Sequence, residues 1–463
     1  MNPELGRNLW LQFSAIRLLL APVVIGAILA LTWLVADREW LGVAQVGETI
    51  YILLILLWGT RRAADLVAEE IAGGTWDGQR MSALGAWLMS WGKLLGGTSY
   101  VWYCAGLAFI AQVIAAWLDG TAPWAPGQWT KLLQLLGAGA LAQAVAMLVS
   151  LALLRRQAAR RRLGVTLSQI VGILAGIAAS GKLDGALFDF QTSGLLWYGW
   201  HWDGPRFYLA SLGLFLAWSV FGIYRLMRVE LKFRSGPTAW LAFALFLMIY
   251  GDGFLYRPIM VAGGALGAWL ILPFLLAVGL TYLAVFLEPK DVMRYRWLLA
   301  ALAAGELRQA WSLLPQWLPV YALALLSAFL LCFSADLSDL DHRLLSGPLV
   351  AASELAHVPD LAFYPLAVSI YLLRDVLLVL YCNFGRGRQR GDATAFILLF
   401  VAYGPLAGIL SSLGIAEAIP LLAPYPLAPP LHSFAAAVIQ SAAMAMLVRG
   451  RLVRAGRFSP AVA

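Results

Sequence analysis

Charged residues are scarce in this 463-residue chain. Asp, Glu, Lys and Arg together make up 13% of it, whereas 61% of the residues are hydrophobic. Soluble domains carry about 25% charged residues, because their surfaces must be covered by groups that water solvates. A soluble protein of this length would need such a surface on each of its domains. The scarcity of charge therefore excludes an ordinary soluble protein and makes lipid the solvent for most side chains.

Cysteine and histidine are also rare and widely scattered. The chain has three cysteines and four histidines, at positions Cys104, Cys332, Cys382, His201, His342, His357 and His432. The cysteines are odd in number and widely spaced, unlike a disulfide framework, and the histidines lack the short spacing of zinc ligands. We therefore predict no metal site and no catalytic residue of these types. The net charge of +8 does not indicate nucleic acid, since no basic face lies outside the apolar runs.

Long hydrophobic runs dominate what is present. A helix needs about 20 apolar residues to cross about 30 Å of hydrocarbon. Twelve segments qualify, namely 16–36, 43–60, 96–118, 132–154, 163–180, 207–224, 238–250, 259–287, 318–334, 361–381, 393–413 and 433–448. The seventh is short, so it is expected to be re-entrant or to form a hairpin with the eighth. The sequence thus predicts an all-α, polytopic helix bundle with about twelve transmembrane helices.

The charges of the loops give the orientation. Basic clusters occupy every second loop and the tail, at 155–162, 225–234, 290–308, 386–390 and 449–457, and the largest intervening loop carries the acidic residues Asp336, Asp339, Asp341, Glu354 and Asp360. Lys and Arg are retained on the cytoplasmic side of membranes. Both termini are therefore predicted to be cytoplasmic, in a multi-pass protein of the cell membrane, most simply the bacterial cytoplasmic membrane.

Two stretches are amphipathic without spanning. The first, 3–17, places Leu5, Leu9 and Phe13 at helical spacing, and the second, 306–317, precedes the ninth run. Each is expected to lie in the interface and then turn into a span. Both begin with Glu-Leu, followed by Arg and Trp, which suggests a degenerate second half of the chain from about residue 290. We otherwise expect one transmembrane domain over 1–463.

The segment between the second and third runs, 61–93, differs from the other loops. Residues 61–70 favour a helix that continues the second span into the cytoplasm, and Gly73 and Gly74 break it. Thr75 is expected to cap a new short helix by accepting a backbone N–H, with Asp77 in its first turn. Gly92 and Lys93 then mark the entry into the third span. A soluble partner protein could bind such a short helix on the cytoplasmic side and displace it.

This segment resembles the intracellular coupling segment of type-2 ABC exporter permeases. That pattern has an acidic residue, then Gly-Thr, a short helix with a Ser, and Gly-Lys at the next span, and here it is matched by Glu70, Gly74, Thr75, Ser82, Gly92 and Lys93. The helix over 3–17 resembles the elbow helix of the same family. The resemblance implies the membrane subunit of an exporter. The chain departs from the family in having about twelve spans instead of six, and Ala83 where Pro is frequent.

A phosphate-binding loop of the type Gly-x-x-x-x-Gly-Lys-Ser/Thr is lacking. The nearest approach, Gly85 to Lys93, has the wrong spacing and is followed by Leu94. We therefore expect no ATP hydrolysis and no cofactor in this chain, with ATP and Mg²⁺ on a separate ATPase subunit. A second copy of the chain or another permease chain could complete the pore. The alternatives are an ion-coupled carrier with twelve helices and a membrane enzyme acting on lipid-linked substrates.

A few polar residues lie within the apolar runs. Arg374 and Asp375 fall in the tenth run, where charges are costly and face protein or water. They form a substrate or gating contact, or else an arginine that reaches to the interface beside a carboxylate paired with a neighbouring cation. Gln143, with Gln134 in the same run and Gln169 in the next, is expected to form hydrogen bonds between helices, with a substrate contact as the alternative.

Overall fold

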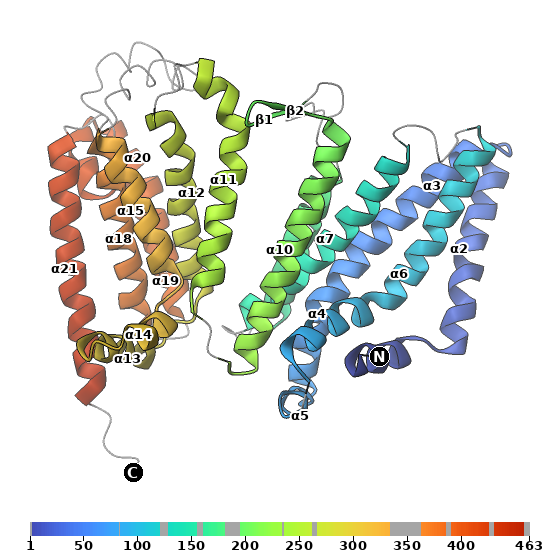
Figure 1. The fold of residues 1–463 in the computed structure, drawn as a ribbon, viewed down its shortest axis with the longest axis horizontal. Coiled ribbons are helices and arrows are strands. Elements are labelled where there is room, and N and C mark those ends of the chain that lie inside the picture. The colour runs from blue at the N-terminus through green and yellow to red at the C-terminus, as the bar shows by residue number, and fades with distance from the viewer. Residues whose placement is uncertain are drawn as a thin grey trace. The chain divides into compact units, whose positions relative to one another are not determined.

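The computed structural model describes residues 2–82, 84–120, 128–154, 161–180, 195–233, 236–261, 266–333, 363–385, 390–425 and 430–457. Contacts divide the chain into two compact units, Met1–Leu195 with His201–Ser235 and Leu196–Trp200 with Gly236–Ala463 (Figure 1). The boundary near residue 235 lies well before residue 290, where the sequence suggested that a second half begins. The acidic loop 336–360, Ala83 and most of the basic loop 155–162 lie outside the described residues.

The first unit consists of helices. They are α1 (Pro3–Gln12), α2 (Ala15–Val35), α3 (Trp40–Leu53), the π-helical turn η1 (Leu54–Gly59), α4 (Thr60–Ala72), α5 (Trp76–Arg80), α6 (Ala86–Leu118), α7 (Gln128–Leu154), α8 (Arg161–Ala178) and α10 (Gly204–Glu230). Helix α7 contacts α4, α8 and α10, while α3 packs on α6. The elements α3, η1 and α4 run on as one helix of 33 residues.

The second unit is also built of helices. They are α11 (Thr238–Val261), α12 (Leu266–Leu287), α13 (Val292–Ala303), α14 (Leu307–Leu313), α15 (Trp317–Phe333), α18 (Tyr364–Asn383), α19 (Gly391–Val401), the π-helical turn η5 (Ala402–Leu406), α20 (Ala407–Ser412), the 3-10 helix η6 (Ala416–Leu421) and α21 (Pro430–Arg457). A short hairpin, β1 (Leu195–Trp197) and β2 (Trp200–Trp202), precedes α10.

The all-α polytopic architecture is confirmed. Among the described residues, ten helices are long and apolar enough to cross a membrane, and the pair α14 and α15, bent by 97°, raises the number to eleven. Together with the shorter apolar helix α8, these account for the twelve predicted spans. Helix α2, for example, has 21 residues, which at about 1.5 Å per residue matches the thickness of the hydrocarbon layer.

Three predicted boundaries are wrong. The seventh run is no short re-entrant segment, because α11 has 24 residues and continues to Val261. It packs against α12, as the predicted hairpin with the eighth run requires. The eighth span therefore begins only at Leu266. The third span begins at Ala86 instead of residue 96, so the helix extends beyond its apolar part. At the end of α11 and at the start of α6, the predicted run stops near a charged residue, Asp252 or Lys93, whereas the backbone hydrogen bonding of the helix continues past it.

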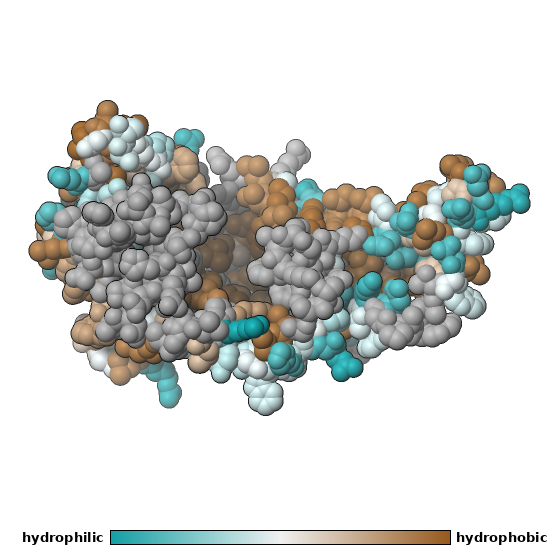
Figure 2. All heavy atoms as spheres, turned by 90° about the horizontal axis from the view of Figure 1, so that it is seen from above, coloured by the Kyte–Doolittle hydropathy of each residue, from teal (hydrophilic) through white to brown (hydrophobic). Residues whose placement is uncertain are grey.

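Hydrophobic side chains cover the outside of the helices, as expected where lipid is the solvent. On α2 the side chains of Leu19, Val23 and Leu31 are more than half exposed, and on α19 the same holds for Phe396 and Phe400. Figure 2 shows hydrophobic residues at the margin of the view beside polar ones. Each unit also has its own buried core. The first unit has two clusters, one around Tyr51 and Val101 and one around Leu66 and Met147.

Candidate functional site

The turn that ends α4 has the geometry that the sequence predicted for the start of the coupling segment. Gly74 adopts φ +70°, its N–H donates to the carbonyl of Ile71, and the N–H of Thr75 donates to the carbonyl of Glu70. These two bonds form a Schellman motif, which closes a helix with a left-handed residue. Glycine suits this position because an L side chain is strained at such a φ. The predicted helix break is confirmed.

The short helix that follows, α5, is also confirmed, but its predicted cap is wrong. Thr75 occupies the position before the helix and Asp77 lies in the first turn. The hydroxyl of Thr75, however, donates to the carbonyl of Glu70 at 3.2 Å and accepts no backbone N–H of α5. The reason is the Schellman turn, which brings the carbonyl of Glu70 within reach of the hydroxyl. Ser82 follows α5 and donates to the carbonyl of Gln79.

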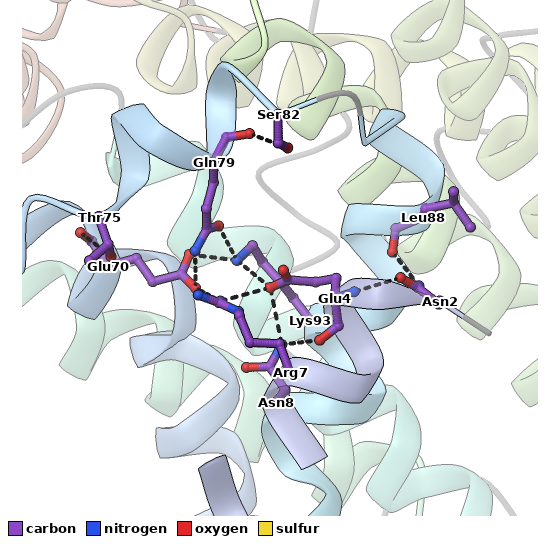
Figure 3. Close-up of polar contacts among 10 residues, drawn as sticks. All are labelled: Asn2, Glu4, Arg7, Asn8, Glu70, Thr75, Gln79, Ser82, Leu88 and Lys93. Atoms are coloured by element: carbon purple, nitrogen blue, oxygen red, sulfur yellow. Dashed lines mark hydrogen bonds and ion pairs between the residues drawn. The ribbon is translucent and has the colours of Figure 1, made fainter. Parts of the chain in front are cut away.

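The side chain of Lys93 is the centre of the site (Figure 3). It is 1% exposed, and its ammonium lies 2.8 Å from Glu4 Oε1, 2.5 Å from Glu70 Oε2 and 2.6 Å from Gln79 Oε1. An ammonium has three donors, so each has one acceptor here. The acceptors come from α1, α4 and α5, while Lys93 itself belongs to α6. One buried cation thus connects four helices.

Arg7 adds a second cation to the cluster. Its guanidinium bonds to Glu70 Oε1 at 2.5 Å and to Glu4 Oε1 at 3.0 Å. The amide of Gln79 also donates to Glu70 Oε1, at 2.9 Å. Two carboxylates therefore face two cations, and the charges within the cluster balance. Such balance is needed because an unpaired charge at this burial would be strongly unfavourable.

Helix α1 docks on α6 through its polar stripe. Glu4, Asn8 and Gln12 recur every fourth residue and are the buried side chains of α1, whereas Trp10 is 81% exposed. The amide of Asn2 donates to the carbonyl of Leu88 at 2.7 Å. The polar stripe therefore faces protein, which leaves the apolar side of this interfacial helix for lipid.

Glycines on α6 make this close approach possible. A Cβ atom at Gly92 would lie 2.6 Å from Asn2 Nδ2 and 3.0 Å from Glu4 Cβ, and one at Gly96 would lie 2.8 Å from Asn8 Cβ. Gly92 and Gly96 are four residues apart and therefore share one face of α6. Small residues in this spacing let two helices approach closely. The Gly-Lys pair thus has a physical role: Gly92 admits α1 and Lys93 binds it.

The charges around Glu4 also set its protonation. Burial alone would raise the pKa of Glu4. The hydrogen bond and the positive charge of Lys93, together with Arg7, instead hold this pKa below its usual value of 4.5. Glu4 is therefore a carboxylate at neutral pH and acts as an acceptor only.

The outer side of α5 and of the residues beside it is exposed. The residues Gly74, Thr75, Asp77, Gly78, Met81 and Ser82 are all exposed. Behind them, Trp76 is 4% exposed and its ring lies 5.5 Å from the ammonium of Lys93. The guanidinium of Arg80 donates twice to the carbonyl of Glu230 at the end of α10. The helix α5 is thus held to the unit by its inner face and presents its outer face.

The sequence identified part of this cluster. It singled out Glu70, Asp77 and Lys93, of which Glu70 and Lys93 meet, whereas Asp77 points to Arg80 at 3.2 Å. It did not identify Glu4, Arg7 and Gln79. The signal available for α1 was its polar stripe at a spacing of four, which is unusual in a helix expected to lie on lipid. The similar start of the second amphipathic stretch does not repeat this role, because Glu306 is exposed.

A separate network in the second unit contains Arg374 and Asp375. Asp375 is 0% exposed. Its Oδ2 accepts from the hydroxyls of Tyr282 and Tyr403, both at 2.5 Å, and its Oδ1 accepts from Arg374. The carboxylate is paired with a neighbouring cation, as one of the two predicted arrangements requires. That cation is the adjacent Arg374, which is 11% exposed and so does not extend to an interface.

Arg374 also holds the chain after α20. Its Nη1 donates to the carbonyl of Leu422 at 2.8 Å and to Gln440 Oε1 at 2.7 Å. The amide of Gln440 in turn donates to the carbonyl of Leu421 at 2.8 Å. Leu421 and Leu422 end a 3-10 helix, where backbone carbonyls lack partners within the helix. Non-helical backbone is tolerated among spans where protein groups satisfy it, so the network has a structural role.

Gln143 lies in the first unit and forms the predicted bond between helices. Its Oε1 accepts from the indole N–H of Trp102 on α6, at 2.8 Å. Gln169 donates to the carbonyl of Leu57 at 2.9 Å. Both glutamines lie against the π-helical turn η1, a relationship that the sequence did not predict.

Comparisons with protein-family models, with curated proteins and with solved structures find no match to this chain. In the part of the chain that the structure describes, no group of three or more His, Cys, Asp or Glu side chains could hold a metal ion. The functional argument consequently depends on the geometry around Lys93.

Proposed function

We propose that this protein is the membrane subunit of an ABC exporter, in which a separate cytoplasmic ATPase drives transport by moving helix α5. The observation that carries the proposal is that α5 is bound to the protein on one face and exposed on the other. Its inner face is fixed by Lys93 and Arg80, and its outer face is exposed. A loop that merely joins two spans needs neither a buried cation nor a short helix that is fixed on one face.

The arrangement suits the transfer of force. A displacement of α5 changes the distances from Lys93 to Gln79 and to Glu70. Because Lys93 is buried and its charge has to remain paired, α1, α4 and α6 have to follow. The resemblance of Glu70, Gly74, Thr75, Ser82, Gly92 and Lys93 to the coupling segment of type-2 ABC exporter permeases supports the same assignment. The proposal includes three further points. Transport is directed out of the cell, the partner subunit binds ATP and Mg²⁺, and the protein lies in the bacterial cytoplasmic membrane.

The experiment is a purification from membranes in mild detergent with a tag at the C-terminus. We expect an ATPase to co-purify, measured as release of ADP by the eluate. Replacing Gly74 by Val and Thr75 by Trp should abolish the co-purified ATPase activity. The substituted side chains would strain the left-handed turn and block the exposed face of α5.

A matched control is available in the other unit. Gly305 has φ +75° and open space around its Cβ position, as Gly74 does. Gly305→Val therefore introduces the same local strain at a turn that has no part in the proposed docking, and it should leave the ATPase bound. If no ATPase co-purifies, or if both variants retain it equally, the proposal is wrong. Transport driven by an ion gradient without an ATPase would then favour a carrier.

A further inference from the structure

The long helix that carries the coupling segment is interrupted by one π-helical turn. The helix runs from Trp40 to Ala72, and residues Leu54–Gly59 form the turn η1 between α3 and α4. A π-turn accommodates one extra residue in a helix and is found mostly at functional sites. The coupling helix α5 follows α4 directly, so η1 lies between α5 and the part of the span formed by α3.

The turn also marks a boundary in the packing of the first unit. Val43 and Tyr51, before it, belong to the cluster formed with α2 and residues 101–115 of α6, which also includes Ile55 of the turn itself. Ala63, Leu66 and Val67, after it, belong to the cluster formed with α7, α10 and the first residues of α6. The two ends of the helix are therefore held in different cores. Within this helix, a rotation of α4 relative to α3 would be accommodated at η1.

Three side chains contact the turn with polar groups. Gln169 donates to the carbonyl of Leu57 at 2.9 Å, and the hydroxyl of Thr60 donates to the carbonyl of Leu56. The amide of Gln143 lies against Gly59, since a Cβ atom there would be 2.3 Å from Nε2. Side chains thus bond carbonyls that the widened turn leaves accessible.

The amide nitrogen of Gln143 has no acceptor. An indole N–H is only a donor, so the bond from Trp102 fixes the oxygen of Gln143 toward Trp102 and the nitrogen toward Gly59. Gln143 is 1% exposed, and its Nε2 is buried without a hydrogen-bond partner. A buried donor without an acceptor is unfavourable. Such a group is explained if a second conformation supplies the acceptor.

We propose that η1 is a two-state hinge, in which α4 rotates relative to α3 and Gln143 Nε2 binds a backbone carbonyl of the turn in the second state. A change of the turn from π-helix to α-helix would rotate α4 relative to α3 by about 100°, the angle that one residue spans in an α-helix. Such a rotation would displace Glu70 and α5 while α3 stays packed. The hinge rests on the proposed function only for the force that drives it, which is the movement of α5 by the ATPase.

The test measures distances between two spin labels in lipid nanodiscs. The labels are attached at Leu41→Cys on α3 and Met81→Cys after α5, which are 49% and 84% exposed, after Cys104, Cys332 and Cys382 are replaced by Ala. The otherwise unaltered protein should show two distance populations. Removing Leu57 takes the extra residue out of the turn, leaves both flanking helices in register, and should give one narrow population.

A matched deletion tests whether the helix tolerates the loss of one residue only because that residue lies in the π-helical turn. Removing Ile110 from the regular helix α6, where it is 57% exposed, shifts the register of all that follows and should lower the yield of folded protein. If the Leu57 deletion itself fails to fold, Gln143→Met serves instead. It retains the size of the side chain without its amide, and the second population should fall about tenfold.

The outcomes separate the hinge from the proposed function. Two populations in the protein alone, reduced to one by the deletion or shifted by Gln143→Met, support the hinge even if no ATPase is found. A single narrow population in the unaltered protein, or populations that neither variant changes, would overturn it. When an ATPase does bind, ATP should shift the populations of the unaltered protein and leave the deletion variant unchanged.

Discussion

The ammonium of Lys93 lies 2.8 Å from Oε1 of Glu4, although the two residues are 89 positions apart in the sequence. Both side chains are buried, with 1% and 3% exposed. The pair joins α1 to α6, the helix that follows α5. It explains why the first helix of the protein has a polar stripe although it lies beside lipid.

The first prediction concerns removal of the central cation. Lys93→Met leaves the carboxylates of Glu4 and Glu70 with Arg7 alone, and loss of one partner of a buried ionic cluster costs about 3–5 kcal/mol. We expect a large decrease in the unfolding temperature in detergent, measured by calorimetry. The exposed pair of Arg62 and Glu69 provides the comparison. Arg62→Met should cost at most about 1 kcal/mol, and equal losses for both variants would contradict the central role of Lys93.

The second prediction concerns pH. Glu4 has a lowered pKa in the folded protein, so its ionisation stabilises the docked α1 fully above the usual value of 4.5. This stabilisation is lost as the pH falls through the lowered value. A spin label at Trp10→Cys should therefore become mobile in this acidic range and stay immobile at neutral pH. In Glu4→Gln the docking should be weaker at neutral pH and the acid transition smaller. An unchanged transition in that variant would assign it to another group.

The third prediction concerns the glycines of α6. Gly92→Ala and Gly96→Ala place a Cβ atom 2.6 Å from Asn2 Nδ2 and 2.8 Å from Asn8 Cβ. Such overpacking costs about 1–3 kcal/mol, and protease sensitivity of the N-terminus should increase. Gly106→Ala is the control on the same helix, because no atom lies within 4 Å of the added Cβ. That variant should be neutral or slightly more stable, since alanine favours helices.

The fourth prediction concerns the network in the second unit. Arg374→Met and Asp375→Leu should each destabilise the protein by about 3–5 kcal/mol, since each leaves a buried charge unpaired. The double variant should lose less than the sum of the two, because both charges are then absent. Thermal unfolding of the four proteins in nanodiscs measures this coupling. Additive losses would show that Arg374 and Asp375 act independently, and that their bond contributes little.

Much of the fold could be predicted from the sequence because lipid imposes a simple rule. A span must satisfy its own backbone and present apolar side chains, so runs such as 16–36 and 132–154 predicted α2 and α7 without knowledge of their neighbours. The break at Gly73 and Gly74 could be predicted for a similarly local reason, since only glycine readily closes a helix at positive φ. Hydropathy failed at the start of α6, where the helix extends on the N-terminal side of the charged residue Lys93.

The site itself was determined only in part by the sequence. Glu70, Gly74 and Lys93 could be singled out by their local pattern, because helix ends, turns and entries into spans follow from neighbouring residues. That Glu4, Arg7 and Gln79 surround Lys93 was decided by the tertiary structure alone. So was the position of Gln143 against a π-helical turn. The physical reason is that a buried charge or amide needs partners, and which residues become partners depends on how separate helices pack.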